Sequence, residues 1–545
     1  MLRSPRAALA EGLEGALAEI GVADPPPLEL VRSKLQERGD YSTSVALKLA
    51  SGLRLPPAAI ASRLALAWRS EVADAEAKGG YVNFRLSPVW LRRLVLHVGD
   101  GGTWGPSDLG RGGTRQVEFA SVNPTGPLHI GHGRGVILGD VLCRLLGYAG
   151  YQVQREYYVN DQNTQARRFG ASIWSRLKGA APPEGGYTGE YVAQLAEAAR
   201  QQLPGIDGWP EDEAQEELRR FGVHAMVERL AESVARVGVH YDRWLYESSL
   251  WDEGLPQTAI QRLRQGGHLK EMEGALWFSP EVPGWEEKDE DRVVIRSNGE
   301  PTYFASDLGY LLSKFEERAF ERAIVVWGAD HHGYVPRIRA AMAALGIDPE
   351  RLVVILNQLV NLKEGKMSKR QGRFVTMDEL VDRVGPDAVR YFYLMRSPEA
   401  MMEFDLELAT SRTSDNPVFY AQYAHARLAN VEPNARDRHP ALPEAARVDL
   451  LTEPRELQLA RQIAYFPEVI ELAATNLEPH RLPYYVHELA DAVHTFYHSG
   501  NDDPELRVVV ADPELTRARL QLCRAARHTL AQALGVLGVS APERM

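Results

Sequence analysis

The chain has 545 residues, of which 44% are hydrophobic and 25% are charged. These fractions are typical of globular proteins and exclude a disordered or fibrous chain, and the length predicts three or four domains. Lysine and arginine number 62 against 74 acidic residues, which gives a formal net charge of −12. This charge argues against a uniformly basic protein that coats nucleic acid.

The two cysteines, Cys143 and Cys523, lie far apart, and neither has a second cysteine or a histidine cluster beside it. This pattern argues against a disulfide scaffold and against a structural zinc site, and it indicates a cytoplasmic protein. Glu11 and Glu14 interrupt the apolar stretch that a signal peptide would need. No uncharged apolar run approaches the ~18 residues of a membrane span, so we expect no membrane association.

Residues 1–110 are expected to form a first, α+β domain. Hydrophobic periodicity predicts helices at 5–20, 41–52 and 57–69, a strand at 79–87, and a helix at 89–98. The glycine-rich segment 99–113 has the composition of a linker.

A different pattern follows the linker. A strand at 115–121, a helix at 135–150 and a strand at 151–159 form a predicted βαβ unit, which begins a parallel sheet. Strands at 323–330 and 351–360 would supply its second half. Residues 181–292 carry the equivalent of the whole net charge and are helical in pattern, so we expect an insertion at about 165–292. From about 400 onward, strand patterns give way to amphipathic helices.

The first candidate site, 123–133, lies between the first strand of the sheet and the helix after it. A helix N-terminus binds phosphate readily, Gly131 and Gly133 allow close approach of a ligand, and His129 and His132 can donate to phosphate oxygens. A glycine-rich turn with two surface histidines is an equally good interpretation of this segment alone.

The second candidate site, 363–373, follows the last predicted strand. It carries five cationic side chains and one carboxylate, with glycines at both ends. Such a loop can bind anions, although most lysine-rich segments of this kind are solvated surface loops.

Together, HIGH at 129–132 and KMSKR at 366–370 resemble the two signatures of class I aminoacyl-tRNA synthetases, in order and in context. The resemblance implies an α/β fold with a Rossmann-like parallel-sheet catalytic domain, in which both segments hold ATP while the amino-acid carboxylate attacks its α-phosphate. It assigns catalysis to His129, His132, Lys366 and Lys369. The implied ATP site comprises Pro124, Thr125, Gly126, His129, Gly131, His132, Gly328, Lys366, Met367, Ser368 and Lys369.

Further blocks narrow the resemblance to the bacterial arginyl-tRNA synthetase family: VEFASVNPTGPLHIGHGRG, PTYFASDLGY, GADHHGYVPR and the C-terminal LGVSAPERM. Carboxylates near strand ends suit a cationic substrate, because a guanidinium takes bidentate carboxylate bonds. The implied arginine site comprises Glu118, Ser121, Asn123, His132, Tyr303, Asp307 and Asp330. The chain departs from the family's KMSKS pattern only at Arg370.

The resemblance also implies three parts and their partners. Residues 1–110 would be the family's added domain, which contacts the outer corner of tRNA through Asn83. Residues 111–395 would be catalytic, and 396–545 a helical anticodon-binding domain that uses Tyr420 and Met545. The i, i+4 spacing of Phe419 and Tyr423 on a helix instead predicts that these two rings belong to the core. The implied substrates and partners are ATP with Mg²⁺, L-arginine and tRNA(Arg), and the chain is expected to be a monomer.

Two other functions fit part of this pattern. A small-molecule adenylyltransferase also uses an HxGH turn, but it leaves the first and last regions without a role. A non-catalytic tRNA-binding paralogue would be expected to lack pocket or phosphate-binding residues, which this chain keeps. Within the superfamily, cysteinyl and methionyl enzymes generally rely on cysteine-rich metal sites, which a chain with two cysteines cannot form. The 234 residues from His132 to Lys366 leave no room for the editing domain of an isoleucyl-type enzyme.

The acidic C-terminal region constrains how RNA could bind there. Residues 401–545 sum to −7. An anticodon surface in this region is therefore expected to rely on stacking and on hydrogen bonds to base edges more than on phosphate attraction.

Overall fold

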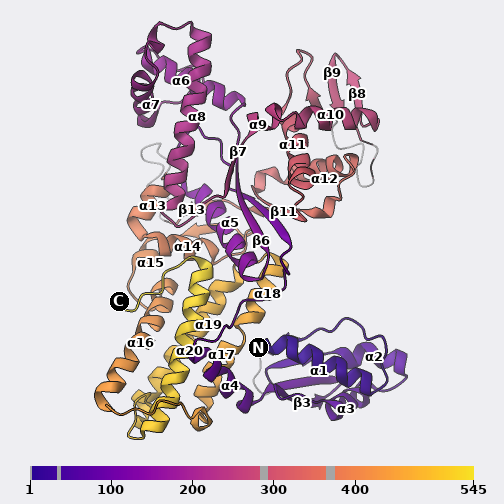
Figure 1. Ribbon diagram of the computed structural model, residues 1–545, viewed down its shortest axis with the longest axis vertical. Coiled ribbons are helices and arrows are strands. Elements are labelled where there is room, and N and C mark those ends of the chain that lie inside the picture. Colours follow the sequence, from indigo (N-terminus) through magenta and orange to yellow (C-terminus); the bar gives the residue numbers. More distant parts are fainter. Residues whose placement is uncertain (1–2, 34–37, 281, 283–291, 364–374) are drawn as a thin grey trace. The chain divides into compact units, whose positions relative to one another are not determined.

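The computed structural model describes residues 3–33, 38–280, 282, 292–363 and 375–545 (Figure 1). The chain divides into two compact units. One comprises residues 108–411, and the other combines residues 1–107 with 412–545.

A five-stranded parallel sheet forms the centre of the unit 108–411. Its strand order is β12-β11-β5-β6-β7, with β5 in the middle. The strands are β5 (Thr114–Phe119), β6 (Gln152–Val159), β7 (Arg243–Tyr246), β11 (Arg322–Gly328) and β12 (Leu352–Asn357). Helices cover the sheet (Figure 1), and this explains why β11 is a nearly continuous apolar run, as expected of a parallel strand buried on both faces. The predicted α/β fold class is confirmed.

Helix α5 (Ile130–Tyr148) follows β5 and packs against it. A Cβ on Gly139 would overlap the Phe119 ring, so only glycine allows the helix to lie this close to the strand. The helix ends before Gly150, which has φ of +89° and lets the chain turn into β6. The sequence therefore specifies both the start and the end of the helix that carries the first motif.

The predicted insertion is not purely helical. Strand β7 arises inside it and pairs in parallel with β6, so this part of the chain completes the edge of the main sheet. Its four residues begin with Arg243, and so short a strand gives no clear alternation in the sequence. The segment also contains β8 (Leu269–Met272) and β9 (Ala275–Phe278), which form a three-stranded antiparallel sheet with β10 (Arg292–Ile295).

The remaining elements of this unit are short strands and helices. Strands β13 (Val360–Leu362) and β14 (Met402–Phe404) pair in parallel, so one strand does occur beyond residue 400. The helices are α6 (Thr164–Leu177), α7 (Glu190–Gln202), α8 (Glu211–Ala235), α9 (Glu247–Asp252), α10 (Leu255–Gln265), α11 (Tyr303–Leu312), α12 (Val335–Ala344), α13 (Met377–Val384), α14 (Pro386–Leu394) and α15 (Leu406–Thr410).

The other unit begins with a small α+β region. Its antiparallel sheet has the order β1-β2-β4-β3, formed by β1 (Val31–Arg32), β2 (Tyr41–Thr43), β3 (Ala73–Lys78) and β4 (Tyr81–Leu86). Its helices are α1 (Pro5–Glu19), α2 (Val45–Leu53) and α3 (Pro57–Ala67). The helix predicted at 41–52 is wrong at its start, because residues 41–43 pair with β4 as a strand.

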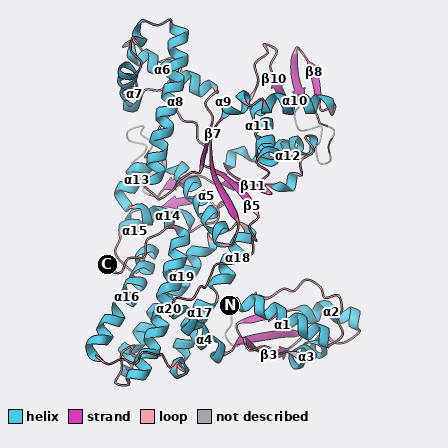
Figure 2. Cartoon of the chain, in the orientation of Figure 1, coloured by secondary structure: helices cyan, strands magenta, loops and turns pink. Residues whose placement is uncertain are grey.

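Helices of the C-terminal segment complete this unit (Figure 2). They are α16 (Pro417–Arg438), α17 (Pro454–Ala464), α18 (Phe466–Asn476), α19 (Arg481–Asp502) and α20 (Pro513–Leu537). Helix α4 (Pro88–Gly99) packs on α20, where Gln521 Nε2 donates to the Leu96 carbonyl at 3.2 Å and to Asp100 at 2.6 Å. The predicted helical C-terminal region is confirmed.

Candidate functional site

The HIGH turn forms the N-terminal cap of α5. His129 is the N-cap residue, and its Nδ1 accepts a hydrogen bond from the Gly131 N–H at 3.0 Å. His132 Nδ1 lies 3.4 Å from the His129 N–H, and the two ring centres are 3.4 Å apart. Because both Nδ1 atoms accept, each neutral ring carries its proton on Nε2, which makes Nε2 the donor.

Both imidazoles favour the neutral form. Burial lowers the pKa of His129, and burial together with the neighbouring His129 lowers the pKa of His132 to about 3. At neutral pH the pair therefore offers hydrogen-bond donors at a helix N-terminus and no positive charge of its own. A ligand anion at this turn would be attracted by the helix dipole and by cations from elsewhere.

The chain on both sides of the second motif is fixed to the unit 108–411. Before it, the Lys363 ammonium lies 2.6 Å from Asp405, and its backbone N–H donates to the Phe404 carbonyl. After it, Thr376 forms a β-bridge with His129, which places residue 376 directly beside the HIGH turn. The predicted site residues Lys366, Met367, Ser368 and Lys369 lie outside the described residues.

The loop before the HIGH turn contacts the predicted insertion. Asn123 Nδ2 donates to Gln165 at 3.0 Å, and Asn163 Nδ2 donates to Asn123 Oδ1 at 2.9 Å. The Tyr191 hydroxyl on α7 donates to the carbonyl of the buried residue Thr125, which follows the buried Pro124. A Cβ on Gly126 would lie 3.3 Å from that hydroxyl. The insertion thus helps to shape the loop 123–126.

A cavity of about 350 Å³ lies beyond this loop, lined mostly by polar side chains. It is bounded by residues that follow β6, by α9 and by the start of α11. Its lining includes Asn163, Glu247, Trp251, Tyr303 and Ser306. Asn163 therefore both lines the cavity and contacts the loop that precedes the HIGH turn.

Asp307 lies one turn along α11 from Tyr303 and is a buried carboxylate. The Tyr334 hydroxyl donates to Asp307 Oδ2. Burial raises the pKa of Asp307 to about 6; Tyr334 and Lys314 lower it and Glu118 raises it further. A carboxyl with this pKa is ready to ionise when a cation binds beside it.

Glu247, which the sequence analysis did not select, is a second buried acid in this region. Its Oε1 accepts from the Ser306 hydroxyl at 2.5 Å, and Trp251 Nε1 donates to that hydroxyl at 3.0 Å. Its Oε2 is buried and has no hydrogen-bond partner, and burial raises the pKa of Glu247 to about 7. Glu247 directly follows β7, so a prediction of that strand would have pointed to Glu247 as a candidate site residue.

The remaining acidic residues predicted for the pocket, Glu118 and Asp330, differ in burial. Glu118 is buried and paired with Lys314 at 2.7 Å, and the Ser121 hydroxyl donates to its other oxygen at 3.2 Å. Asp330 is largely exposed beside His331 and does not line the cavity. A Cβ on Gly328, at the end of β11, would overlap the Asp330 carboxylate.

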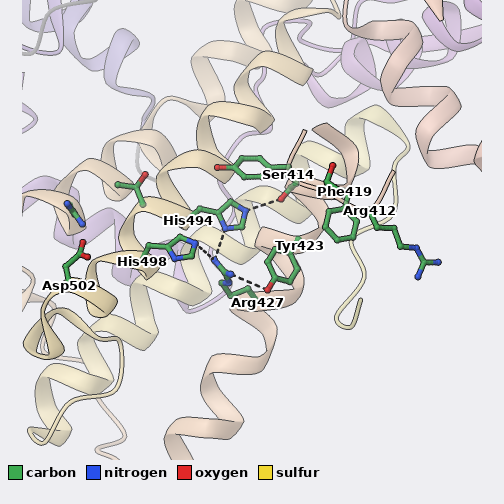
Figure 3. A pocket seen from close by; sticks show the side chains of 12 residues that line it. Arg412, Ser414, Phe419, Tyr423, Arg427, His494, His498 and Asp502 are labelled. Atoms are coloured by element: carbon green, nitrogen blue, oxygen red, sulfur yellow. Dashed lines mark hydrogen bonds between the residues drawn. The ribbon is translucent and has the colours of Figure 1, made fainter. Parts of the chain in front are cut away.

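In the helical part of the other unit, residues 412–545 (the helical unit below), aromatic and imidazole side chains line a cavity of about 470 Å³ (Figure 3). Arg427 lies at its centre, 2.9 Å from His494 Nδ1 and 4.6 Å from the ring centre of Tyr423. Tyr420 and Phe419 also line this cavity, and Phe419 stacks on Tyr423. The prediction that Tyr423 belongs to the core is wrong, since Tyr423 is 40% exposed, whereas Phe419 is partly buried.

The C-terminal residues lie along α16, the helix that carries these rings. His425 contacts the Pro542 carbonyl at 2.9 Å, and Asn430 donates to the Glu543 carbonyl at 2.9 Å. Met545 is 55% exposed. In the small sheet, by contrast, Asn83 lies on β4 and is only 8% exposed.

Within the described residues, no group of three or more His, Cys, Asp or Glu side chains could hold a metal ion. The same search of described helices finds none long and apolar enough to span a membrane. Glu247, Asp307 and Glu118 each contact a protein partner, namely Ser306, Tyr334 and Lys314.

Three family models match almost the entire chain. The arginyl tRNA synthetase N terminal domain matches residues 7–86, and the DALR anticodon binding domain matches residues 421–545. The model described as tRNA synthetases class I (R), catalytic domain, matches residues 110–177 and 187–432.

Individual relatives agree with the family models. The arginine–tRNA ligases of Citrifermentans bemidjiense and Geobacter sp. are 41% and 42% identical to this chain, with 99% of each chain covered. The solved Thermus thermophilus arginyl-tRNA synthetase is 27% identical with a TM-score of 0.81, covering 99% of this chain and 100% of that one. Because relatives more than 40% identical cover nearly its whole length and share its fold, the chain belongs to the arginyl-tRNA synthetase family of class I aminoacyl-tRNA synthetases.

Proposed function

We propose that the chain catalyses the ATP-dependent activation of L-arginine to arginyl-adenylate and the transfer of the arginyl group to the 3′ end of tRNA(Arg). The polar cavity connected through Asn163 to the loop of the HIGH turn, with the buried acid Glu247 in its lining, carries this proposal. Parallel sheets bind their ligands at the carboxyl ends of the strands, and this cavity is bounded by residues that follow β6 and β7.

In the activation step, the arginine carboxylate attacks the α-phosphate of ATP and pyrophosphate leaves. His129 and His132 would donate from Nε2 to the phosphate oxygens, because both rings are neutral and both Nδ1 atoms are already engaged. Lys366 and Lys369 would supply the positive charge that the histidines lack. The roles need positioned donors and cations, and no side chain has to act as a covalent nucleophile.

Mg²⁺ would enter with ATP. Magnesium in such sites is held largely by substrate phosphates and water, with one or two carboxylates. The ion would supply charge neutralisation on the leaving pyrophosphate.

The arginine guanidinium would bind between Asp307 and Glu247, with Tyr303 at the rim. A free oxygen on Glu247 and a carboxyl of raised pKa on Asp307 are both suited to a planar cation. Asn123 and Ser121 would orient the α-amino and carboxylate groups of the arginine substrate. Asp330 is better placed to meet the nucleotide, because it follows Gly328 at the end of β11 and is exposed.

The helical unit would read the anticodon. Unpaired bases stack on aromatic rings, and the cavity around Tyr420 and Tyr423 provides rings beside the guanidinium of Arg427. Asn83 would contact the outer corner of tRNA, for which its low exposure requires movement of neighbouring side chains. We further propose a cytoplasmic monomer that divides at about residues 110 and 395.

Amino-acid-dependent exchange of pyrophosphate into ATP tests this function. The chain should support exchange with L-arginine in the presence of tRNA(Arg), and with none of the other nineteen amino acids. Exchange with another amino acid would contradict the proposed substrate. Failure with every amino acid, while tRNA(Arg) still binds, would favour the non-catalytic paralogue.

A further inference from the structure

Helix α11 and the turn that follows it carry a stripe of polar side chains. Tyr303, Asp307, Tyr310 and Lys314 are spaced by four, three and four residues, which places them along one face of a helix. The stripe ends in a π-helical turn, Ser313–Glu317, that directly continues α11. Such turns are rare and are frequently found at functional sites.

The π-helical turn directs Lys314 inward. Its ammonium is 3% exposed and lies 2.7 Å from Glu118 Oε2, on the central strand β5. It also lies 3.9 Å from the ring centre of Tyr310. Because the Ser121 hydroxyl donates to Glu118 Oε1, both oxygens of Glu118 are occupied by donors from the protein.

The charge of the region follows from these pairings. Glu118 is balanced by Lys314, whereas one oxygen of Glu247 has no hydrogen-bond partner and Asp307 accepts from the neutral Tyr334 hydroxyl. Among the described residues, no cation is hydrogen-bonded to Glu247, which lines the cavity, or to Asp307, one helical turn from the lining residue Tyr303. A guanidinium supplies the planar cation that both can bind.

We propose that Lys314 is a positioning residue for arginine recognition, which fixes and neutralises Glu118 so that Asp307 and Glu247 are the carboxylates that receive the guanidinium. The inference rests on the proposed function and goes beyond it, because it assigns a role in binding the cationic substrate to the positively charged side chain of Lys314. Without Lys314, the buried Glu118 carboxylate would compete for the substrate or for a proton.

The electrostatic surroundings of Asp307 support this role. Its burial and the charge of Glu118 raise the pKa of Asp307, while Tyr334, Lys314 and Arg337 lower it. Glu247 in turn feels Asp307 and Asp161, both of which raise its pKa. Loss of Lys314 should therefore move the ionisation of Asp307 to higher pH.

Arg318, one turn further along, provides a matched control. It is also a largely buried cation paired with a sheet carboxylate, Glu156 on β6, at 3.2 Å from Nη2 to Oε1. Glu156 also accepts from the Tyr310 hydroxyl at 2.5 Å, and neither Glu156 nor Arg318 is among the groups that most affect the pKa of Asp307. Truncation of Arg318 therefore disturbs a similar ion pair without changing the charge beside Asp307.

The test measures pyrophosphate exchange with saturating tRNA(Arg) between about pH 5.5 and 8.5, in wild type, Lys314→Met, Lys314→Met/Glu118→Gln and Arg318→Met. For Lys314→Met we expect the arginine KM to rise about tenfold, with little change in the ATP KM, and the acid limb of kcat/KM for arginine to move to higher pH. The double variant should recover most of this loss, because it removes both charges. Arg318→Met should lower Tm while its arginine KM and pH profile stay those of wild type.

Several results would overturn the inference. One is an arginine KM and an acid limb that stay unchanged in Lys314→Met, and another is an equal rise of the KM values for arginine and ATP. A third is a double variant as impaired as Lys314→Met, which would make Glu118 a direct ligand of arginine. If Lys314→Met does not fold, the double variant carries the test, and a large rise of its arginine KM contradicts the proposal. A wild-type chain that shows exchange with a different amino acid would overturn the proposed function itself, and this inference with it.

Discussion

At the scale of single residues, the site depends on groups whose ionisation is shifted by burial. Glu247 and Asp307 have a pKa raised to about 7 and to about 6 by desolvation, while His132 has one lowered to about 3. In each case burial shifts the ionisation equilibrium toward the neutral form. A cationic substrate reverses this preference for the two acids, because it stabilises the carboxylates.

Arginine binding should therefore depend on pH. Carboxyls with a raised folded-state pKa contribute stability at low pH, and this contribution is lost as the pH rises through about 7 for Glu247 and about 6 for Asp307. Arginine should offset that loss, so its stabilising effect should be larger at high pH. Thermal unfolding with and without arginine should show a greater rise in Tm at about pH 8 than at about pH 5.5. An equal rise at both pH values would contradict this assignment.

Glu247 can be tested separately. Glu247→Gln keeps the shape of the side chain and removes its charge, so we expect the arginine KM to rise by about 10- to 100-fold, a loss of about 1.5–3 kcal/mol for a charged hydrogen bond. The KM for ATP should hardly change. Glu253, an exposed glutamate directly after the same helix that does not line the cavity, serves as control, and Glu253→Gln should retain the wild-type arginine KM. Comparable effects of the two substitutions would remove Glu247 from the site.

At the scale of secondary-structure elements, the packing of α5 on β5 fixes the position of the HIGH turn. Gly139 is required because any side chain there would meet the Phe119 ring, whereas Gly147 on the same helix has open space around its Cα. The two glycines therefore form a matched pair for the same substitution.

Gly139→Ala should destabilise the catalytic unit by about 1–3 kcal/mol through overpacking, and should lower kcat because the HIGH turn moves with the helix. Gly147→Ala should leave activity unchanged and stabilise the helix by up to about 1 kcal/mol, since alanine loses less backbone entropy than glycine. Denaturant unfolding and exchange kinetics measure both effects. Equal stability of the two variants would show that the α5–β5 contact is looser than described.

The predictions for elements succeeded where periodicity was long and failed where strands were short. The strand–helix–strand unit at 114–159 is confirmed because apolar runs and glycine stops are local features. Strand β7 was missed since four residues are too few for alternation to emerge, and its partner β6 lies more than 80 residues earlier. Missing β7 also hid Glu247, which follows it.

At the scale of the whole molecule, charge is distributed unevenly along the chain. The region 181–292 sums to −12 and the region 401–545 to −7, so positive charge for phosphate contacts must come from the remaining regions. The exposed rings around Tyr423 and the guanidinium of Arg427 agree with the expectation that the helical unit uses stacking. Tyr423 lies on this exposed surface, although its helical spacing from Phe419 predicted a position in the core.

Tyr423→Ala should weaken tRNA(Arg) binding by about 1–3 kcal/mol, the value of one stacked base, and this loss should be nearly independent of salt. The arginine KM at saturating tRNA should stay unchanged. Tyr484, also exposed but outside the aromatic cavity, is the control, and Tyr484→Ala should bind tRNA as wild type does. A loss that disappears at high salt would instead indicate phosphate attraction.

The sequence by itself determined the fold class, the HIGH turn at the start of a helix, the helical C-terminal region and the resemblance to the family, because these depend on local patterns and motifs. Only the tertiary structure decided which acids lie together. Glu118, Asp307 and Glu247 come from three separate elements, and their partners Lys314, Tyr334 and Ser306 determine which of them can receive a cation. Burial and pairing depend on contacts between distant residues, so no local pattern in the sequence could reveal them.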